Sequence, residues 1–401
     1  MIREFLVECE AFLEKDLIQF AMCGDSGKYS PYTAVRSLDT QRILLLINST
    51  PSKADDISVH LDLNKEEVHK CLSALSKCGL INDSEGKISP SFPIFTVKDQ
   101  VLLEPIIKKL ARETAAAVQR RMNELESLID DLSLTERGLT FSDLEYIIIG
   151  AVTLDYNGLR VLKEEGLLCP GKKMPGKGNY MFSGLECGLV DLKKGWMWGH
   201  NSGFGRYWFS SHGRVSKDFR MAFPDLAWQW VGQVEQSAII AEMEKTGQIL
   251  EALSREDLSL VNLKGRIGRN DELLAQLAML LGLGYVVFAD KKWRINRPFF
   301  TVDDLGKIGK VSELILREVA KSLKEKQAKM LEGYDHTSPS ENEIPFEEAF
   351  NLIYHLIFEQ ALDLMMRNRT FDPPLRHSNG RYSPFVAVGI ESLLSMLGLK
   401  S

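Results

Sequence analysis

The feature that most constrains the fold of this chain is an internal repeat. The segment 92–99 (FPIFTVKD) recurs as 297–304 (RPFFTVDD), a shift of 205 positions. The same shift preserves an apolar stripe at helical spacing, in which Val68, Leu72 and Leu75 align with Leu273, Leu277 and Leu280. Chance similarity does not hold one register over such a distance, so the sequence predicts two structurally equivalent halves.

Length and composition place the chain among folded intracellular proteins. Its 401 residues leave room for two or three domains, and 44% hydrophobic with 26% charged residues is typical of a globular protein. No apolar run reaches the roughly 18–20 residues that cross a bilayer. The N-terminus lacks the basic-then-apolar layout of a signal peptide. We therefore expect a cytoplasmic protein that does not cross a membrane.

Cysteine content and charge narrow the classes of function further. The six cysteines are too sparse for a disulfide scaffold, and no Cys-x-x-Cys pair suggests a metal or redox centre. We expect neither a metal nor a cofactor. The formal net charge is −6, so any binding to DNA has to come from a local basic surface.

The first repeat copy predicts a helix-turn-helix followed by a hairpin. Its pattern gives helices over 40–48, 53–61 and 65–77, with Asn64 as the N-cap of the third and Cys78-Gly79 as its end. Strand-forming residues then flank the turn 82–86. This order of elements is that of a helix-turn-helix with an appended wing.

The segment 68–81 (VHKCLSALSKCGLI) resembles the recognition helix and following strand of winged-helix transcriptional regulators of the ArsR and MarR type. The resemblance covers about 60 residues in each copy and implies that this helix enters the major groove of DNA. In the first copy the candidate DNA-binding residues are Lys65, His69, Lys70, Ser73 and Lys77. In the second copy they are Lys264, Arg266, Arg269, Lys291, Lys292, Arg294 and Arg297.

Charge distinguishes the two copies. The predicted wing of the first carries Asp83 and Glu85, which repel phosphate, whereas the cations of the second are grouped around Trp293. Exposed hairpins are often charged without binding DNA. A protein-interaction scaffold, in which the winged helices no longer contact DNA, is therefore the main alternative.

Long helical stretches follow each wing, at 101–131 and 305–333, with Pro105 expected in the opening turn of the first. The resemblance implies that such an element mediates dimerisation. Because the unit is duplicated, the two helices can instead pair inside one chain as a pseudo-dimer. A homodimer and this intramolecular pairing both remain open, with the second favoured.

A second, shorter sequence repeat (called the echo) relates residues 27–35 (GKYSPYTAV) to residues 380–388 (GRYSPFVAV). A weaker form of it occurs at 178–182. Each follows an amphipathic stretch, at 2–21, 346–368 and 141–165 respectively. Serine before proline suits a helix start, and a helix start can also hold an anion. Both interpretations stay open.

The central segment is rich in aromatic residues. Five of the six tryptophans lie within 179–231, where residues 196–209 predict a hairpin. The segment has no obvious repeat partner and is interpreted as an insertion. It is either a packed core, a nucleic-acid stacking surface or a pocket for a small ligand. The candidate ligand-binding residues are Trp196, Trp198, His200, Asn201, Arg206, Tyr207, Trp208 and His212.

Catalytic motifs are weak. Cys187, His200 and His212 match no standard zinc spacing, and the sequence Ser210-Ser211-His212 lacks a nucleophile elbow. An enzyme with its site near 200–212 is kept as the second alternative.

The sequence thus predicts a mainly α protein with small β-wings, of α+β class, with tandem winged helices joined by long helices and a central aromatic β-containing segment. The expected function is a DNA-binding transcriptional regulator, with double-stranded DNA as partner and control by a small ligand. The expected segments are 1–35, 36–100, 101–169, 170–240, 241–304 and 305–401.

Overall fold

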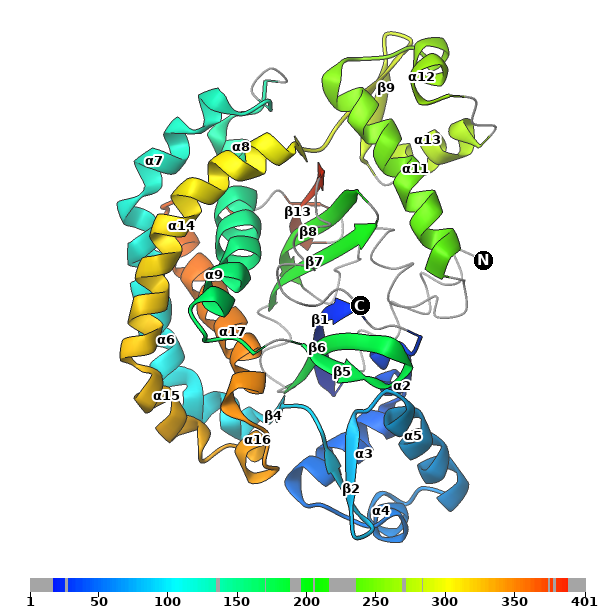
Figure 1. The fold of residues 1–401 in the computed structure, drawn as a ribbon, viewed down its shortest axis with the longest axis vertical. Helices are drawn as coiled ribbons and strands as arrows, with labels where there is room; N and C mark the ends of the chain where they lie inside the picture. The colour runs from blue at the N-terminus through cyan, green and yellow to red at the C-terminus, as the bar shows by residue number, and fades with distance from the viewer. Residues whose placement is uncertain are drawn as a thin grey trace.

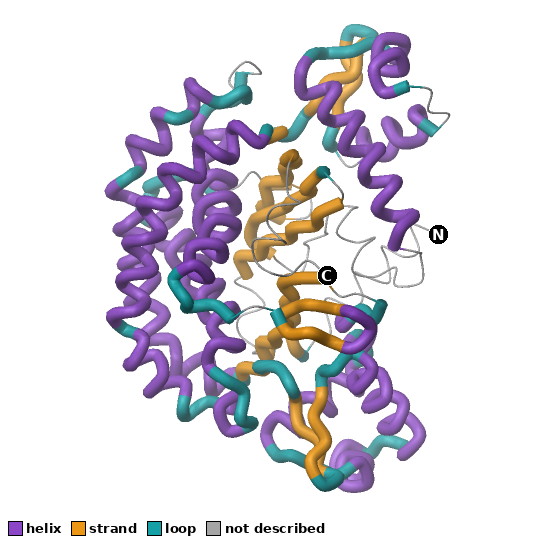
Figure 2. Tube along the Cα trace, viewed as in Figure 1, coloured by secondary structure: helices purple, strands orange, loops and turns teal. Residues whose placement is uncertain are grey.

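The architecture below comes from a computed structural model of the chain. It describes residues 17–25, 28–134, 138–169, 171–187, 196–204, 206–215, 236–268, 272–282, 284–373, 376–377 and 380–388. Within these ranges the protein is mainly helical with small sheets, as expected for the α+β class. Helices line one side, the sheets lie beside them, and a compact unit of helices and a hairpin stands at each end (Figures 1 and 2).

The unit at one end is called the first unit and spans residues 38–90. It contains α3 (Leu38–Ser49), α4 (Ala54–Leu61), α5 (Lys65–Lys77) and the hairpin of β2 (Ile81–Ser84) and β3 (Lys87–Pro90). Short elements precede it, namely β1 (Ile18–Asp25) and α2 (Pro31–Val35). Asn64 caps α5 as predicted, because its Oδ1 accepts a bond of 2.7 Å from the Glu66 amide.

The unit at the other end is called the second unit and spans residues 236–295. It contains α11 (Gln236–Arg255), α12 (Leu260–Ile267), α13 (Leu273–Gly282) and the hairpin of β9 (Val286–Ala289) and β10 (Lys292–Ile295). Its hairpin strands begin and end 205 residues after those of the first unit. The predicted equivalence of the two copies is therefore confirmed at the level of their elements.

The helices after each unit repeat in the same way. The first set is α6 (Val97–Arg120), α7 (Met122–Ser127), the short η1 (Ile129–Asp131), α8 (Phe141–Tyr146), η3 (Ile147–Asn157) and α9 (Gly158–Glu164). The second set is α14 (Val302–Glu325), α15 (Gln327–Tyr334), α16 (Ser338–Glu341) and α17 (Phe346–Arg367). The predicted place of Pro105 in an opening turn was wrong. The helix α6 begins at Val97, because Thr96 and Asp99 form a capping box, so Pro105 lies inside it.

Two small sheets follow the same plan. In one, β6 (Gly178–Glu186) lies between antiparallel β1 and parallel β4 (Ile94–Phe95), and β5 (Lys172–Met174) also pairs with it. In the other, β13 (Gly380–Val388) lies between antiparallel β8 (Tyr207–Val215) and parallel β11 (Phe299–Phe300). The strands β7 (Trp196–Phe204) and β12 (Arg376–His377) extend this second sheet.

This topology corrects the interpretation of the central segment as an insertion. The strand β8 occupies the place in its sheet that β1 occupies in the other, so it is a repeat partner that sequence alignment missed. The repeated unit therefore includes the strand that precedes each three-helix unit. The expected segment 170–240 contributes β5 and β6 to one sheet and β7 and β8 to the other.

Two local expectations were also wrong. Residues 18–21, expected at the end of an amphipathic helix, belong to strand β1, because they pair with β6. The echo at 380–388 is strand β13 and the weaker one at 178–182 lies in strand β6. Only the first echo opens a helix, α2, where Ser30 is the N-cap but makes no side-chain capping bond. A recurring helix start is therefore ruled out.

The helical side interlocks the two halves. The long helix α6 packs on α17 of the other half, α14 packs on η3, and α6 and α14 contact one another. Where α6 meets α14, Arg120 pairs with Glu318, and Glu113 pairs with Lys326 at 2.8 Å. The largest hydrophobic core draws its residues from both halves. The predicted contact of the two long helices within one chain is thus present.

The capping boxes of the long helices tie each half to the other. Asp304 accepts bonds from the amide and hydroxyl of Thr301, and also from the amide (2.8 Å) and hydroxyl (2.7 Å) of Ser133. In the other half Asp99 accepts from both groups of Thr96 and from the amide of Ser338 at 3.0 Å. Both aspartates are buried, and Ser133 and Ser338 stand at equivalent repeat positions. Each helix start therefore binds a serine of the opposite half.

The symmetry breaks at η3, an 11-residue π-helix whose counterpart in the other half is part of the α-helix α17. Every residue of η3 is buried. A side chain at Gly158, directly after it, would clash with the hydroxyl of the buried Tyr354, so glycine lets the two helices pack closely here. That hydroxyl donates to the Leu154 carbonyl at 2.6 Å. Long π-helices are rare and often accompany functional sites.

Candidate functional site

The helix α5 presents a polar face to solvent. Val68, Leu72 and Leu75 are buried against α3 and the hairpin. On the opposite side all five predicted DNA-binding residues of the first unit are exposed, namely Lys65, His69, Lys70, Ser73 and Lys77. At 100° per residue His69, Ser73 and Lys77 follow one another along the centre of this face. The predicted stripe and the predicted contact face are therefore on opposite sides of one helix.

Acidic groups surround the face of α5. Lys65 makes an ion pair of 2.6 Å with Asp55, and this hydrogen bond holds the pKa of the Asp55 carboxyl below its usual value. Glu66 and Glu67 are exposed in the first turn of the helix, and Asp83 and Glu85 are exposed in the hairpin. The cations of α5 that make no ion pair with a described residue are Lys70 and Lys77.

The equivalent helix of the second unit, α13, has an apolar face. It buries Leu273, Leu277 and Leu280, as the repeat predicts. On the solvent side His69, Lys70, Ser73, Ser76 and Lys77 are replaced by Leu274, Ala275, Ala278, Leu281 and Gly282. Leu274 is 55% exposed and Leu281 45% exposed. The described part of this helix thus carries no cation with which to meet phosphate.

Some of the cations predicted to bind DNA in the second unit are held in ion pairs, and others are not. Arg266 pairs with Glu256, and Arg294 pairs with Asp257 (2.7 Å) and Asp290 (2.9 Å). Arg297 is half-buried, with its guanidinium beside Gly284. Arg269 lies outside the described residues. The exposed cations that make no ion pair with a described residue are Lys264, Lys291 and Lys292.

The predicted aromatic hairpin exists, as strands β7 and β8. His200 lies opposite Ser211 and Asn201 opposite Ser210 in its register. Five predicted ligand-binding side chains lie outside the described residues, namely those of Trp196, Trp198, His200, Asn201 and His212.

The three predicted ligand-binding residues whose side chains are described have structural contacts. Trp208 is buried against Tyr156 and Phe385, at centroid distances of 4.8 and 5.5 Å. Tyr207 is buried in the core of the second unit, and its hydroxyl donates to Glu251 at 2.5 Å. Arg206 is exposed and pairs with Glu244 and Glu251 of α11. These residues join the hairpin to its neighbours and line neither of the two cavities described next.

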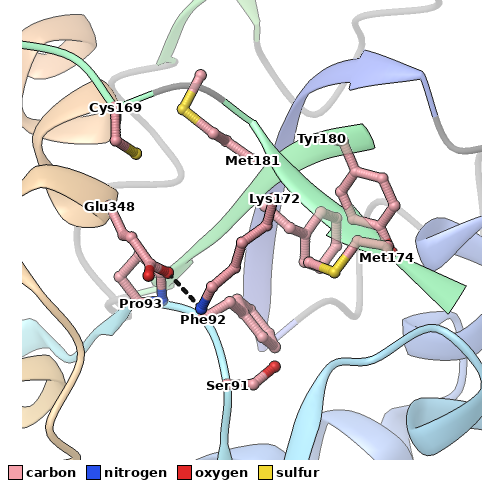
Figure 3. Close-up of a pocket in the computed structure, with 10 residues that line it drawn as sticks. Ser91, Phe92, Pro93, Cys169, Lys172, Met174, Tyr180, Met181 and Glu348 are labelled. Carbon is pink, nitrogen blue, oxygen red and sulfur yellow. Dashed lines mark ion pairs between the residues drawn. The ribbon is translucent and has the colours of Figure 1, made fainter. Parts of the chain in front are cut away.

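Those cavities are small and lie between the first sheet and the helices. The larger holds about 290 Å³ of empty space, part of it open to solvent, and the ion pair of Lys172 and Glu348 (2.8 Å) lies across it (Figure 3). The smaller is lined by Cys23, Leu159, Lys163, Leu168, Cys169 and Met181. Burial and the charge of Asp155 raise the pKa of Cys23 to about 12, and burial followed by the charge of Glu348 raises that of Cys169. Thiols held protonated in this way are poor nucleophiles.

A buried polar group that the sequence did not single out joins η3 to α17. Asp155 is almost fully buried and lies 3.7 Å from Nε2 of His355, whose Nδ1 is 2.7 Å from the Asn351 carbonyl. Burial lowers the pKa of His355, but the hydrogen bond to Asp155 and its charge outweigh this and raise it. Burial, and then the charge of Asp155, raise the pKa of Glu359 well above its usual value. Both shifts favour the protonated forms of His355 and Glu359 relative to the free side chains.

The described residues contain no cluster of three histidine, cysteine or acidic side chains arranged to bind a metal ion. Within the same ranges no helix has both the length and the apolar character that a bilayer span requires. Comparison with family models, with curated proteins and with solved structures finds no match for this chain.

Proposed function

We propose that the chain is a DNA-binding transcriptional regulator of winged-helix type, in which the first unit contacts the duplex through α5. The observation that carries the proposal is the exposed face of α5, where His69, Ser73 and Lys77 follow one another opposite a buried apolar stripe. In a winged helix the element at this position enters the major groove. Lys70 and Lys77 supply the phosphate contacts, and Ser73 is of the right size to reach base edges.

The experiment begins by selecting duplexes from a random-sequence pool on the full-length protein. The affinity for the selected duplex is then measured by fluorescence anisotropy at two salt concentrations, about 50 and about 200 mM. The double variant Lys70→Glu with Lys77→Glu is expected to bind about a hundredfold more weakly and with a shallower salt dependence, because two phosphate contacts become repulsive.

The control is Lys109→Glu, an exposed lysine on α6, outside both units. It makes the same charge change and is expected to leave the affinity almost unaltered. Failure to enrich any duplex, or an equal loss in the control and the double variant, would refute DNA binding through α5.

A second candidate function is the protein-interaction scaffold, and the apolar face of α13 favours it for the second unit. The two functions are compatible, since they use different units. Control by a small ligand stays a prediction, because most of the predicted ligand-binding side chains lie outside the described residues.

A further inference from the structure

We infer that the exposed face of α13 is a docking surface for an acidic amphipathic helix of a partner protein. Leu274, Ala278 and Leu281 stand at i, i+4 and i+7, which places them in one stripe along the solvent side of the helix. Neighbouring elements expose further apolar side chains, with Val261 on α12 78% exposed and Phe288 on β9 53% exposed. Apolar residues spaced in this way match the anchors of a helix that binds lengthwise.

The repeat shows that this face is not a by-product of packing. The core side of α13 keeps leucine at each of the three positions where α5 has a buried apolar residue. The solvent side has lost every polar group that α5 carries at the equivalent described positions, from His69 to Lys77. Burial in the unit's own core cannot account for that change, because Leu274 and Leu281 are about half exposed. Exposed apolar stripes on folded units mark interaction sites.

The charge around α13 sets the chemistry of the partner. Lys264 lies on the preceding helix α12, Lys291 lies in the turn of the hairpin that follows α13, and Lys292 opens strand β10 of that hairpin. All three are exposed and make no ion pair with a described residue, whereas Arg266 pairs with Glu256 and Arg294 pairs with Asp257 and Asp290. A helix with leucines on one side and carboxylates beside them complements both the stripe and the lysines.

Duplex DNA fits this face less well. Base edges and phosphates are recognised by polar and cationic groups, and alkyl side chains meet only the methyl of thymine. The polar counterpart of the stripe is on α5, which is the surface proposed above for DNA. The two surfaces are therefore tested separately, and failure of one leaves the other standing.

The experiment uses the full-length protein and a fluorescein-labelled helical peptide of about 20 residues, with leucine on one side and glutamate on the other. Binding is followed by anisotropy. The variant Leu274→His with Leu281→Ser copies the residues of α5 at both positions and is expected to weaken binding by about tenfold or more. The variant Lys291→Ser with Lys292→Ser is expected to weaken it less and to reduce its salt dependence.

Two controls define the surface and the partner. His69→Ala on α5 is expected to leave peptide binding unchanged, and a peptide with lysine in place of glutamate is expected not to bind. Circular dichroism and thermal melting confirm that the α13 variant is folded, since both of its changes are at exposed positions.

Three results would overturn the inference. The first is absence of peptide binding, or binding that the α13 variant leaves intact. The second is a wild-type dimer that becomes monomeric in that variant, which would assign the face to a second copy of the chain. The third is a loss of duplex binding in the α13 variant as large as that in Lys70→Glu with Lys77→Glu.

Discussion

The helices α5 and α13 occupy the same place in the two units and differ most on the side that faces solvent. Inside, each presents three apolar residues at the same spacing to its own core. Outside, one is polar with two lysines that make no ion pair with a described residue, and the other is a stripe of leucine and alanine. Packing keeps these three core positions apolar, whereas the exposed side is free to change with the ligand. The difference therefore indicates two units with one fold and two tasks.

The largest effect is expected where the two halves are most alike, at the capping boxes of α6 and α14. Asp304→Ala removes four hydrogen bonds to a buried carboxylate and is expected to lower the free energy of unfolding by about 3 kcal/mol. Asp99→Ala removes the same set except for the bond to a serine hydroxyl, so its loss is expected to be about 1 kcal/mol smaller.

Urea denaturation at neutral pH measures both losses. Asp303→Ala, next to Asp304 but exposed, is the control and is expected to change stability little. In a Ser133→Ala background the gap between the two aspartate variants is expected to close. A gap that persists there would mean that Ser133 is not its source.

The next effect concerns η3, where the halves differ. His355 and Asp155 form a partly buried pair that has no charged equivalent, since Gly150 and Gln360 stand at the repeat positions. His355→Gln is expected to cost about 2 kcal/mol near pH 6. The pKa of His355 is raised in the folded state, so the pair contributes fully below the unfolded value of about 6.5 and is lost as pH rises through the folded value.

Glu359 acts in the same direction, because its raised pKa means that ionisation at higher pH also opposes folding. Unfolding measured from about pH 6 to about pH 9 is expected to show stability falling with pH in the wild type and a flatter profile in His355→Gln. The exposed His336→Gln serves as control. If the stability of His355→Gln falls with pH in parallel with that of the wild type, His355 is not a source of the pH dependence.

The smallest effect is expected at the start of α5. Asn64→Ala removes the side-chain cap and is expected to cost about 1 kcal/mol. Arg269 stands at the equivalent repeat position, and its side chain has no acceptor, so Arg269→Ala is expected to cost much less. Thermal melting of the two variants compares them directly. Equal losses would show that the two helix starts are stabilised in the same way.

Much of the fold could be predicted because it depends on local patterns. Asn64 and Gly79 marked the ends of α5, and the shift of 205 residues that aligns the sequences also separates the two observed hairpins. The correspondence of β8 to β1 was missed because only the pairing of β8 with β13, far along the chain, reveals it. The start of α6 was placed too late, because Pro105 was assumed to lie in the first turn. The signal for the helix start is the capping box of Thr96 and Asp99.

The candidate site was predictable only in part. Exposure of the α5 residues followed from helical periodicity, which gives the direction of each side chain. The ion pairs of Arg266 and Arg294 did not follow, since they depend on where Glu256 and Asp257 fall in space. The pair of Asp155 and His355 lies 200 residues apart in sequence and forms only because η3 meets α17. The π-helical form of η3 was equally hidden, because a run such as Ile147-Ile148-Ile149 also suits an α-helix.

Asp99 binds Ser338 and Asp304 binds Ser133, so each half of the chain binds a serine of the other half. This arrangement has a consequence for how the sequence can evolve. In a homodimer every substitution is made twice, and both copies of a surface must accept it. Here the two halves that bind one another belong to a single chain. A substitution in α5 or in α13 is therefore made only once, and the bonds of Asp99 and Asp304 between the halves are kept. Because the two repeats are covalently linked, the first and second units can each acquire a different binding surface while the long helices α6 and α14 stay equivalent.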